Sequence, residues 1–528
     1  MNLLTIRDLT LSIHGTEILR DVDLSVDAGQ IVGIIGESGS GKSMTAFSIM
    51  QLLPRGSVTT GSITLNGIEL LNADEDTMCG LRGNDIGMVF QEPMTALNPV
   101  KTIGSQVAET ILIHGSGSRA EAKARARDVL NRVGLPEAQF PLSRYPHELS
   151  GGQRQRVVIA MAIALRPKLL IADEPTTALD VTTQAQILDL LRRLVREDDM
   201  GLIMITHDLA VVSDMADEIV IMKDGVVVET GAAKTLFREM NHPYTRALFE
   251  ASSHVPDRDG AGDGTQLLRV QGVSRDYRMP RKTVFGAVPV FRAVDNVSFT
   301  VERGESLGLV GESGCGKSTL TRAILGLEEV QEGAIEIEGE PVFSDHHVNL
   351  NVRRKMQVVF QDPYGSFNPR WKVRRLVGEP FHLLEKAPED PRSRVDEALV
   401  SVGLEASDAD KYIHEFSGGQ RQRIAIARAL ILRPELIILD EAVSALDVSI
   451  RAQILDLLAD LSDRLGLTYL FISHDLSVVR SITDRVLVMR AGKIVEQGAT
   501  EDVFENPQHA YTKTLIAAAP RLPDAISA

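Results

Sequence analysis

The stretch Gly36–Ser43 reads GESGSGKS, and Gly311–Ser318 reads GESGCGKS. Both match G-x-x-x-x-G-K-S/T, a loop whose backbone N–H groups surround the phosphates of a nucleotide. The loop lysine places its charge at the β and γ phosphates, and the last serine reaches magnesium. The sequence therefore predicts two nucleotide-binding units in tandem. Their predicted ATP-binding residues are Gly36, Glu37, Ser38, Gly39, Ser40, Gly41, Lys42 and Ser43, and Gly311, Glu312, Ser313, Gly314, Cys315, Gly316, Lys317 and Ser318.

The two halves of the chain repeat one series of motifs. From the middle of each half onward, motif residues recur at a constant offset, as in the pairs Ser150/Ser417 and Glu174/Glu441. A repeat of this kind indicates that both halves fold alike. Residues 252–266 between them are rich in Asp and Gly, which predicts an exposed, flexible linker. We expect a first domain at 1–251 and a second at 267–528.

The pattern of apolar runs predicts an α/β fold in each half. Ile31–Ile35 and Leu307–Val310 lead into the phosphate loops, and two further apolar runs end in carboxylates, at Glu174 and Glu441. Short continuous apolar runs are typical of buried parallel strands. Apolar spacing over 185–195 indicates an amphipathic helix. We predict tandem P-loop NTPase domains, each with a mainly parallel sheet, an antiparallel β subdomain and a helical subdomain.

Composition limits the kinds of partner and environment that the sequence predicts. The formal net charge of −16 argues against a nucleic-acid partner, although it is compatible with a local basic patch. The two cysteines, Cys79 and Cys315, lack metal-ligand spacing and are interpreted as free thiols. Cys315 lies at a predicted helix N-terminus, a position that lowers the pKa of a thiol, so we expect it to be reactive. No apolar run reaches the length of a membrane span, so we expect no direct membrane insertion.

Two acidic pairs follow buried strands, Asp173-Glu174 and Asp440-Glu441. Phosphoryl transfer needs magnesium near the phosphates and a water held in line for attack. We interpret the first acid of each pair as a metal ligand and the second as the group that polarises water. An acid pair alone could equally be a structural strand end, but a phosphate loop in the same half favours catalysis.

A histidine and a glutamine complete each predicted site. His207 and His474 follow apolar strands and could contact a γ-phosphate, or could simply be satisfied strand-end histidines. Gln91 and Gln361 could bridge magnesium and water, or could be solvated loop residues. The candidate metal ligands are Ser43, Gln91, Asp173, Ser318, Gln361 and Asp440. The candidate catalytic residues are Glu174, Glu441, His207, His474, Gln91 and Gln361.

The segments LSGGQRQR (149–156) and FSGGQRQR (416–423) each precede an apolar helix. Backbone amides and the dipole at such a helix start form an anion site. Because each half already has a phosphate loop, we interpret this second anion site as serving the other half's nucleotide. An ordinary serine N-cap is the alternative, and the paired glycines argue against it because they destabilise a helix. The residues are Ser150, Gly151, Gly152, Gln153, Ser417, Gly418, Gly419 and Gln420.

This ordered series resembles the ABC-type ATPases: phosphate loop, Q-loop, SGGQ signature, acidic strand end, ALD turn and switch histidine. The ALD turns are Ala178–Asp180 and Ala445–Asp447. The segments EPMTALNP (92–99) and DPYGSFNP (362–369), with HPYTRAL (242–248) and HAYTKTL (509–515), resemble ATPase subunits of bacterial dipeptide, oligopeptide and nickel importers. The fused pair is most similar to fused ATP-binding proteins of peptide importers, including the microcin C/peptide type.

The resemblance implies an ATPase that uses ATP and Mg²⁺ to energise import of peptides or peptide-like solutes. One composite site would combine Gly36–Ser43 with Ser417–Gln420, and the other Gly311–Ser318 with Ser150–Gln153. The implied partners are two transmembrane permease subunits and an extracytoplasmic solute-binding protein. The implied location is peripheral, on the cytoplasmic face of the plasma membrane.

The resemblance also implies an aromatic residue that stacks on adenine upstream of each phosphate loop. Tyr277 is the candidate in the second half, with Phe291 as its rival, and the first half offers only Ile13 or His14. The segment PRWKVRR (369–375) would receive the permease subunits. The alternative for that segment is a partly buried tryptophan on a solvated basic stretch.

Three other functions fit the sequence less well. A soluble tandem ABC ATPase that acts on ribosomes or DNA typically has a long basic or helical segment between its domains, or zinc-binding cysteines, and neither is found here. An exporter fits the importer-type signatures less well, and a non-hydrolysing sensor conflicts with four intact carboxylates. Dipeptide, oligopeptide, peptide antibiotic and nickel chelate remain open as solutes, because the ATPase units do not contact the solute.

Overall fold

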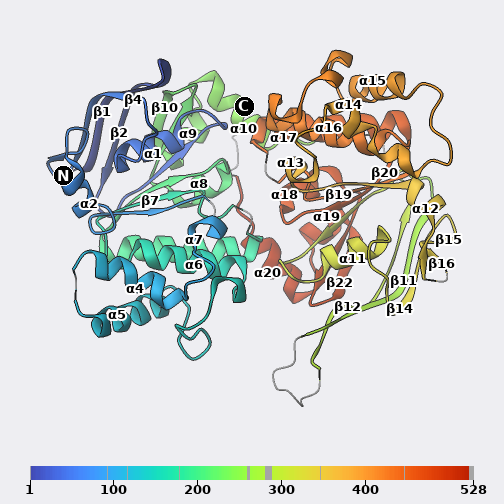
Figure 1. Ribbon diagram of the computed structural model, residues 1–528, viewed down its shortest axis with the longest axis horizontal. Coiled ribbons are helices and arrows are strands. Elements are labelled where there is room, and N and C mark those ends of the chain that lie inside the picture. Colours follow the sequence, from blue (N-terminus) through green and yellow to red (C-terminus); the bar gives the residue numbers. More distant parts are fainter. Residues whose placement is uncertain are drawn as a thin grey trace.

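The computed structural model describes residues 2–91, 93–115, 117–177, 179–258, 262–279, 288–344, 346–444 and 446–522. Figure 1 shows two similar halves side by side, with the N-terminal half in blue to green and the C-terminal half in yellow to red. The expected turn residues Ala178 and Ala445, and residues 259–261 of the expected linker, lie outside the described residues.

Each half contains a six-stranded sheet that carries the phosphate loop. The strand orders are β10-β9-β3-β8-β7-β6 and β18-β19-β20-β13-β21-β22, and all neighbours are parallel except the last hairpin strand of each half. The predicted α/β fold is confirmed. The bounds are β3 Ile31–Ile35, β6 Ile86–Val89, β7 Leu169–Asp173, β8 Gly201–Ile205, β9 Glu218–Lys223, β10 Val226–Ala232, β13 Ser306–Val310, β18 Met356–Val359, β19 Leu436–Asp440, β20 Thr468–Ile472, β21 Arg485–Arg490 and β22 Lys493–Ala499.

An antiparallel sheet opens each half, with the orders β2-β1-β4-β5 and β12-β11-β14-β15. Long strands with an alternating burial pattern pack one face on the phosphate-loop helix and expose the other, as expected for antiparallel sheets. The bounds are β1 Asn2–Ile13, β2 Thr16–Asp27, β4 Ser57–Leu65, β5 Ile68–Glu69, β11 Gln266–Arg278, β12 Val290–Glu302, β14 Glu332–Ile337 and β15 Glu340–Pro341, with a small hairpin of β16 Phe343–Ser344 and β17 His347–Val348 in the second half.

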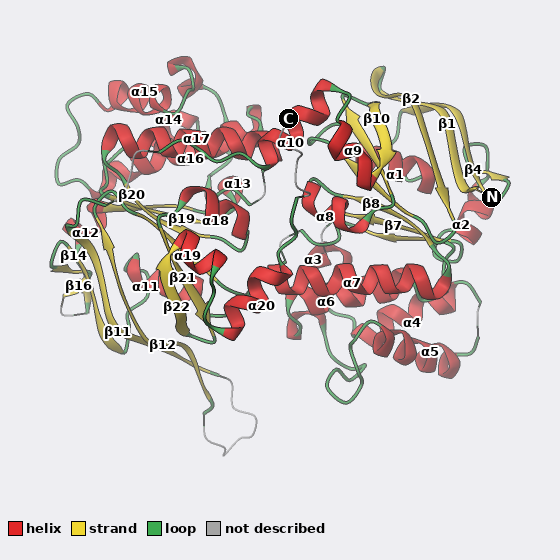
Figure 2. Cartoon of the chain, turned by 180° about the vertical axis from the view of Figure 1, so that it is seen from behind, coloured by secondary structure: helices red, strands yellow, loops and turns green. Residues whose placement is uncertain are grey.

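Helices cover the parallel sheets and form a separate layer in each half (Figure 2). In the first half this helical layer is built from α4 Ile103–Ile113, α5 Arg119–Arg132 and α6 Gly151–Ala162, and in the second from α14 Val373–Val377, α15 Pro391–Ser401 and α16 Gly418–Leu430. The other helices are α1 Lys42–Met50, α2 Glu75–Leu81, α3 Pro93–Ala96, α7 Val181–Asp198, α8 Leu209–Met215, α9 Ala233–Glu239, α10 Pro243–Ser252, α11 Lys317–Ile324, α12 Leu350–Lys355, α13 Pro363–Ser366, α17 Val448–Leu465, α18 Leu476–Ile482, α19 Thr500–Glu505 and α20 Ala510–Ala518, with four short 3₁₀ segments. In the described parts of the chain, no helix is both long and apolar enough to cross a membrane.

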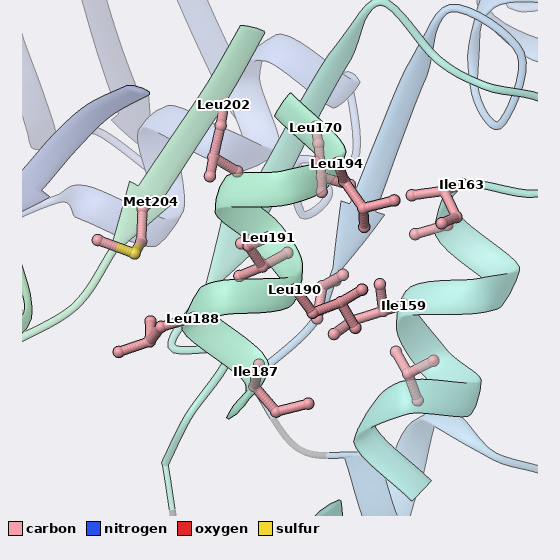
Figure 3. Close-up of a cluster of buried hydrophobic side chains, with 14 of the residues drawn as sticks. Ile159, Ile163, Leu170, Ile187, Leu188, Leu190, Leu191, Leu194, Leu202 and Met204 are labelled. Atoms are coloured by element: carbon pink, nitrogen blue, oxygen red, sulfur yellow. The ribbon is translucent and has the colours of Figure 1, made fainter. Parts of the chain in front are cut away.

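The amphipathic helix predicted around 185–195 is α7, and its apolar face lies on the sheet. Figure 3 shows Leu191 of this helix between Leu202 and Met204 of β8 on one side and Ile159 of α6 on the other, with Leu194 turned toward the side of α6. All five side chains are buried. Burial of such side chains stabilises the fold by roughly 1.5–3 kcal/mol each. This core joins the helical layer to the sheet. It thus fixes α6, the helix that begins at the SGGQ segment, relative to the phosphate loop.

Two helix pairs join the halves. Helix α10 of the first half packs against α17 of the second, and α20 of the second half packs against α7 of the first. Figures 1 and 2 show both pairs where the halves meet. The reciprocal pairing places corresponding surfaces of the two halves head to tail.

The described part of the expected linker is anchored on the second half. The Arg258 side chain is only 8% exposed, and it bonds the Asp484 carboxylate at 2.5 Å and the Ile482 carbonyl at 2.7 Å. His254 lies 2.5 Å from Asp456 of α17. The exposed, flexible segment that composition predicts is therefore not what 254–258 form, because these charged side chains find partners on the second half.

Replacement of Arg258 by alanine should destabilise the second half by about 2 kcal/mol, since it removes charged hydrogen bonds to the partly buried Asp484. Urea denaturation followed by the fluorescence of Trp371, the only tryptophan, measures this change. The control is Arg464→Ala, which removes an exposed i,i+4 pair with Asp460 and should cost less than about 0.5 kcal/mol. Equal midpoints for the two variants would contradict the anchoring role.

Candidate functional site

The phosphate loops follow the central strands β3 and β13 and end in α1 and α11. Gly36 and Gly311 have φ values of 154° and 153°, and a Cβ on either would lie 2.2 Å from a backbone oxygen of the neighbouring strand. Only glycine fits this close approach. Each loop therefore packs closely against a neighbouring strand, β9 in the first half and β21 in the second.

The loop lysines lie inside the loops. Lys42 Nζ donates to the carbonyls of Gly36 and Glu37 at 2.7 and 2.8 Å. Lys317 makes the matching bonds to Gly311 and Glu312 at 2.6 and 3.0 Å. Burial lowers the pKa of Lys42, and the surrounding acids oppose this effect. The phosphate oxygens of a nucleotide would be alternative acceptors for the same ammonium groups.

Asp173 and Asp440 lie at the carboxyl ends of β7 and β19, beside the loops. Oδ1 of Asp173 is buried and has no hydrogen-bond partner among the described residues. Burial raises the pKa of Asp173, and a hydrogen bond with Ser43 opposes the rise. Burial also raises the pKa of Asp440, with a contribution from Glu441. A buried carboxylate oxygen without a partner, next to a serine hydroxyl, fits the hard oxygen ligands that Mg²⁺ requires.

The Glu174 carboxylate contacts three side chains. Gln91 Nε2 and Thr177 Oγ1 each donate to its Oε2 at 2.9 Å, and His207 Nδ1 lies 3.2 Å from its Oε1. Burial alone would raise the pKa of Glu174, but His207 and the other donors outweigh it and lower the pKa to about 2. The carboxylate is therefore ionised at neutral pH. The predicted residues Gln91, Glu174 and His207 are brought together.

The second half repeats part of this network. His474 Nδ1 lies 3.2 Å from Glu441 Oε1, and despite burial this contact lowers the pKa of Glu441. Ser444, which stands where the first half has Thr177, donates to the backbone carbonyl of Glu441 at 2.9 Å instead of to its carboxylate. Gln361 is exposed, and among the described contacts none joins it to Glu441. The two candidate catalytic centres are thus similar but not identical.

Each phosphate loop also receives an aspartate from the opposite half. Ser38 N donates to Asp447 Oδ1 at 2.9 Å, and Ser313 N donates to Asp180 Oδ2 at 3.3 Å. Thr182 adds a hydrogen bond to Glu312 at 3.0 Å. These reciprocal contacts join the turn that follows each acidic pair to the other half's loop.

Comparison with known proteins agrees with this geometry. A family model described as ABC transporter matches residues 19–177 and 294–444, and one described as oligopeptide/dipeptide transporter, C-terminal region, matches 228–271 and 495–527. The chain belongs to the ABC transporter family. It is an ATP-binding, ATP-hydrolysing protein with two tandem ABC units, as the sequence motifs predict.

Two curated relatives of this ABC protein span nearly its whole length. The glutathione import ATP-binding protein GsiA of Salmonella paratyphi A is 46% identical over 98% of this chain and 90% of its own. The GsiA of Escherichia coli K12 is 47% identical over 95% of this chain and 86% of its own. A solved structure of cbiO1 from Clostridium perfringens aligns with 46% of this chain and 92% of its own, at 30% identity and a TM-score of 0.40.

The ABC signature serines do cap their helices. Ser150 and Gln153 form a reciprocal capping box at the start of α6, and Ser417 and Gln420 do the same for α16. The argument from the paired glycines against an N-cap is therefore wrong, while the use of these segments as an anion site for the other half's nucleotide stays a prediction. The second glycine has a packing reason, since a Cβ on Gly152 would lie 2.1 Å from a Thr183 methyl group.

The signature segments are not joined to the opposite phosphate loops. Ser150, Gly151, Ser417 and Gly418 are exposed, and no hydrogen bond among the described residues connects them to the other half's loop. A cavity of about 910 Å³ separates the halves near His207 and His474. Across each ABC interface the structure makes a contact from the aspartate turn, which the sequence analysis did not predict, while the predicted approach of the signature segment is not made among the described residues.

The aromatic candidates for adenine differ between the halves. The hydroxyl of Tyr277 donates to Glu328 and lies 3.5 Å from Thr319 Oγ1, next to the second phosphate loop, while Arg275 lies 5.1 Å from its ring centre. Its rival Phe291 is the paired residue on β12 and is 51% exposed. In the first half, His14 packs on Gly56, where a Cβ would lie 2.5 Å from its ring.

The pKa of the Cys315 thiol differs from the expectation. Cys315 is 6% exposed, and burial raises its pKa despite the nearby Lys317. The predicted lowering of the thiol pKa at the helix N-terminus is therefore wrong, because desolvation disfavours the thiolate, and the reactivity of Cys315 toward thiol reagents stays a prediction. Cys79 is the exposed thiol.

Sequence reasoning missed two groups at the loops. Asp180 and Asp447 were seen only as parts of a family motif, and Tyr244 and Tyr511 only as parts of the repeated segments 242–248 and 509–515. The signal that could have found them is their exact duplication in both halves.

Substitution of His207 by alanine should lower stability in a pH-dependent way. Burial lowers the pKa of His207, but Glu174 outweighs burial and raises it above its usual 6.5. A raised pKa contributes stability that is present below pH 6.5 and is lost as pH rises through the folded-state pKa. The urea midpoint difference from wild type should therefore be largest near pH 6 and smaller near pH 9. The exposed His382→Ala variant is the control, and a difference that grows with pH would contradict the pairing.

Proposed function

We propose that this chain is the subunit that hydrolyses ATP to drive an ABC importer for peptides or peptide-like solutes, with two composite ATP sites between its halves. The reciprocal bonds from Ser38 to Asp447 and from Ser313 to Asp180 carry the proposal. They place each phosphate loop against the other half, so closure of the halves and nucleotide binding share one surface. The intact carboxylate centres favour hydrolysis over a sensor role.

Each composite site has assigned residues. The phosphate loops Gly36–Ser43 and Gly311–Ser318 bind the phosphates, Tyr277 contacts adenine in the second half, and the signatures Ser417–Gln420 and Ser150–Gln153 approach when the halves close. Magnesium would be held by Ser43, Gln91 and Asp173 in the first site and by Ser318, Gln361 and Asp440 in the second, and it would neutralise charge on the phosphates.

In the first site, Glu174 orients the attacking water and accepts its proton. Its lowered pKa keeps it ionised, and Gln91 and Thr177 fix one of its oxygens while His207 fixes the other. We also propose that His207 contacts the γ-phosphate. Glu441 and His474 take these roles in the second site.

The domain bounds, partner subunits and location that we propose follow from the same function. We place the first nucleotide-binding domain at 1–251, the connecting segment at 252–266 and the second domain at 267–528. The chain works with two permease subunits and an extracytoplasmic solute-binding protein, peripherally on the cytoplasmic face of the plasma membrane. The relatives named for glutathione import favour a small peptide as solute.

A basic segment of the second half is the proposed permease contact. Arg370, Lys372 and Arg375 are exposed, and Arg375 lies 3.8 Å above the ring of Trp371. Trp371 itself packs partly against the helical core. The partly buried tryptophan on a solvated basic stretch fits these contacts, and docking of the permease on the exposed basic side chains stays a prediction.

The double variant Glu174→Gln, Glu441→Gln should retain bound ATP and lose at least about 100-fold in hydrolysis, because the groups that accept the water's proton are removed. Phosphate release and nucleotide content after gel filtration measure the two effects. The variant Glu109→Gln, Glu385→Gln, changed at two surface ion pairs, is the control. Hydrolysis near the wild-type rate in the first variant would refute the catalytic assignment.

Charge reversal at Arg370 and Lys372 should lower co-purification of the permease at least tenfold, since exposed basic side chains would face the partner. Affinity purification of the whole complex followed by quantitative blotting measures the amount of permease retained. The matched control reverses two exposed residues nearby in sequence, Lys386 in the segment before α15 and Arg392 on α15. An equal permease yield from both variants would place the docking surface elsewhere.

A further inference from the structure

The repeated segments 242–248 and 509–515 have no part in the catalytic networks, yet their tyrosines contact the phosphate loops. The hydroxyl of Tyr244 accepts a hydrogen bond from the backbone N–H of Glu37 at 3.1 Å. The hydroxyl of Tyr511 accepts the same bond from Glu312 at 3.0 Å. The partners are 207 and 199 residues apart in sequence, and the contact occurs in both halves.

In each loop, the tyrosine and the loop lysine bind the same peptide group. The tyrosine accepts from its N–H, and the lysine donates to its carbonyl. The carbonyl of the Gly36–Glu37 peptide accepts from Lys42 Nζ at 2.7 Å, and its N–H donates to Tyr244. The second loop has the same arrangement around the Gly311–Glu312 peptide. If the lysine turned toward a phosphate, the hydrogen bond to the tyrosine would remain as the described contact of this peptide.

The surroundings of Tyr244 fix its position. His242 caps α10 and accepts from Tyr244 N at 3.2 Å, and Glu229 of β10 accepts from His242 N at 3.1 Å and from the Thr245 hydroxyl. Lys223 Nζ lies 4.9 Å from the tyrosine ring centre. The second half repeats this arrangement with His509, Glu496 and Arg490. Burial raises the pKa of both tyrosines to about 12, so the hydroxyls stay protonated.

The same helices reach the opposite half. Helix α10 packs on α17, which begins directly after Asp447, the residue that accepts from Ser38. Helix α20 packs on α7, which begins directly after Asp180, the residue that accepts from Ser313. Two neighbouring amides of each loop are thus held by two helical segments that pack on each other, one from each half.

We propose that Tyr244 and Tyr511 are positioning residues that hold the first turn of each phosphate loop in its nucleotide-binding shape and fasten it to the helix that contacts the opposite half. The segments 242–248 and 509–515 thereby link nucleotide occupancy to contact between the halves. This inference rests on ATP binding by the two loops and is independent of the transported solute.

The double variant Tyr244→Phe, Tyr511→Phe should weaken binding of the non-hydrolysable analogue AMP-PNP with Mg²⁺ about five-fold, the effect of about one lost hydrogen bond at each loop. In steady-state hydrolysis the KM for ATP should rise by a similar factor, with kcat changed less than about two-fold. Isothermal titration of the full-length chain measures the affinity, and circular dichroism checks the fold.

The matched control is Tyr469→Phe, which removes a buried hydroxyl that donates to Leu458 O at 2.9 Å, away from either loop. It should change thermal stability without changing AMP-PNP affinity. Unchanged affinity in the double variant, or equal weakening in the control, would overturn the positioning role. Absence of AMP-PNP binding by the wild-type chain would instead refute the proposed function.

Discussion

The hydrogen bonds between each phosphate loop and the aspartate of the other half fix how the two halves meet. Asp180 shows the constraint most clearly, because Oδ1 caps its own helix through Thr183 N at 3.0 Å while Oδ2 accepts from Ser313 N at 3.3 Å. A shift of α7 along its axis would break either the cap or the contact between halves. The fold of one half and the shape of the other half's loop are therefore coupled through one carboxylate.

The duplicated architecture is not fully symmetric. Glu174 has three side-chain partners, whereas the described contacts of the Glu441 carboxylate come from His474. The fifth position of the loop is Ser40 in the first half and the buried Cys315 in the second. Among the described residues, an aromatic candidate for adenine stacking lies beside the loop in the second half alone, at Tyr277. These differences lie at the chemical centre, while the contacts that join the halves are reciprocal.

Local motifs made much of this structure predictable. The strands before the phosphate loops and the acidic strand ends were predicted because their buried apolar residues and their functional residues lie next to each other in short stretches of sequence. The N-caps at Ser150 and Ser417 were misjudged because the packing of Gly152 on Thr183 cannot be read from local spacing. The burial of Cys315 and the anchoring of Arg258 depend on residues far along the chain. The tyrosine contacts were missed for the same reason, since about 200 residues separate the partners.

The most direct test of the head-to-tail account asks which signature faces which phosphate loop. In a chain that carries Cys79→Ser and the two Glu→Gln changes, S38C is paired either with S417C or with S150C. A short bifunctional thiol reagent is added with and without Mg-ATP, and the cross-linked peptides are identified by mass spectrometry. The account predicts an ATP-dependent link for S38C with S417C and none for S38C with S150C. A link only in the second pair would show that each half completes its own site and would contradict the account.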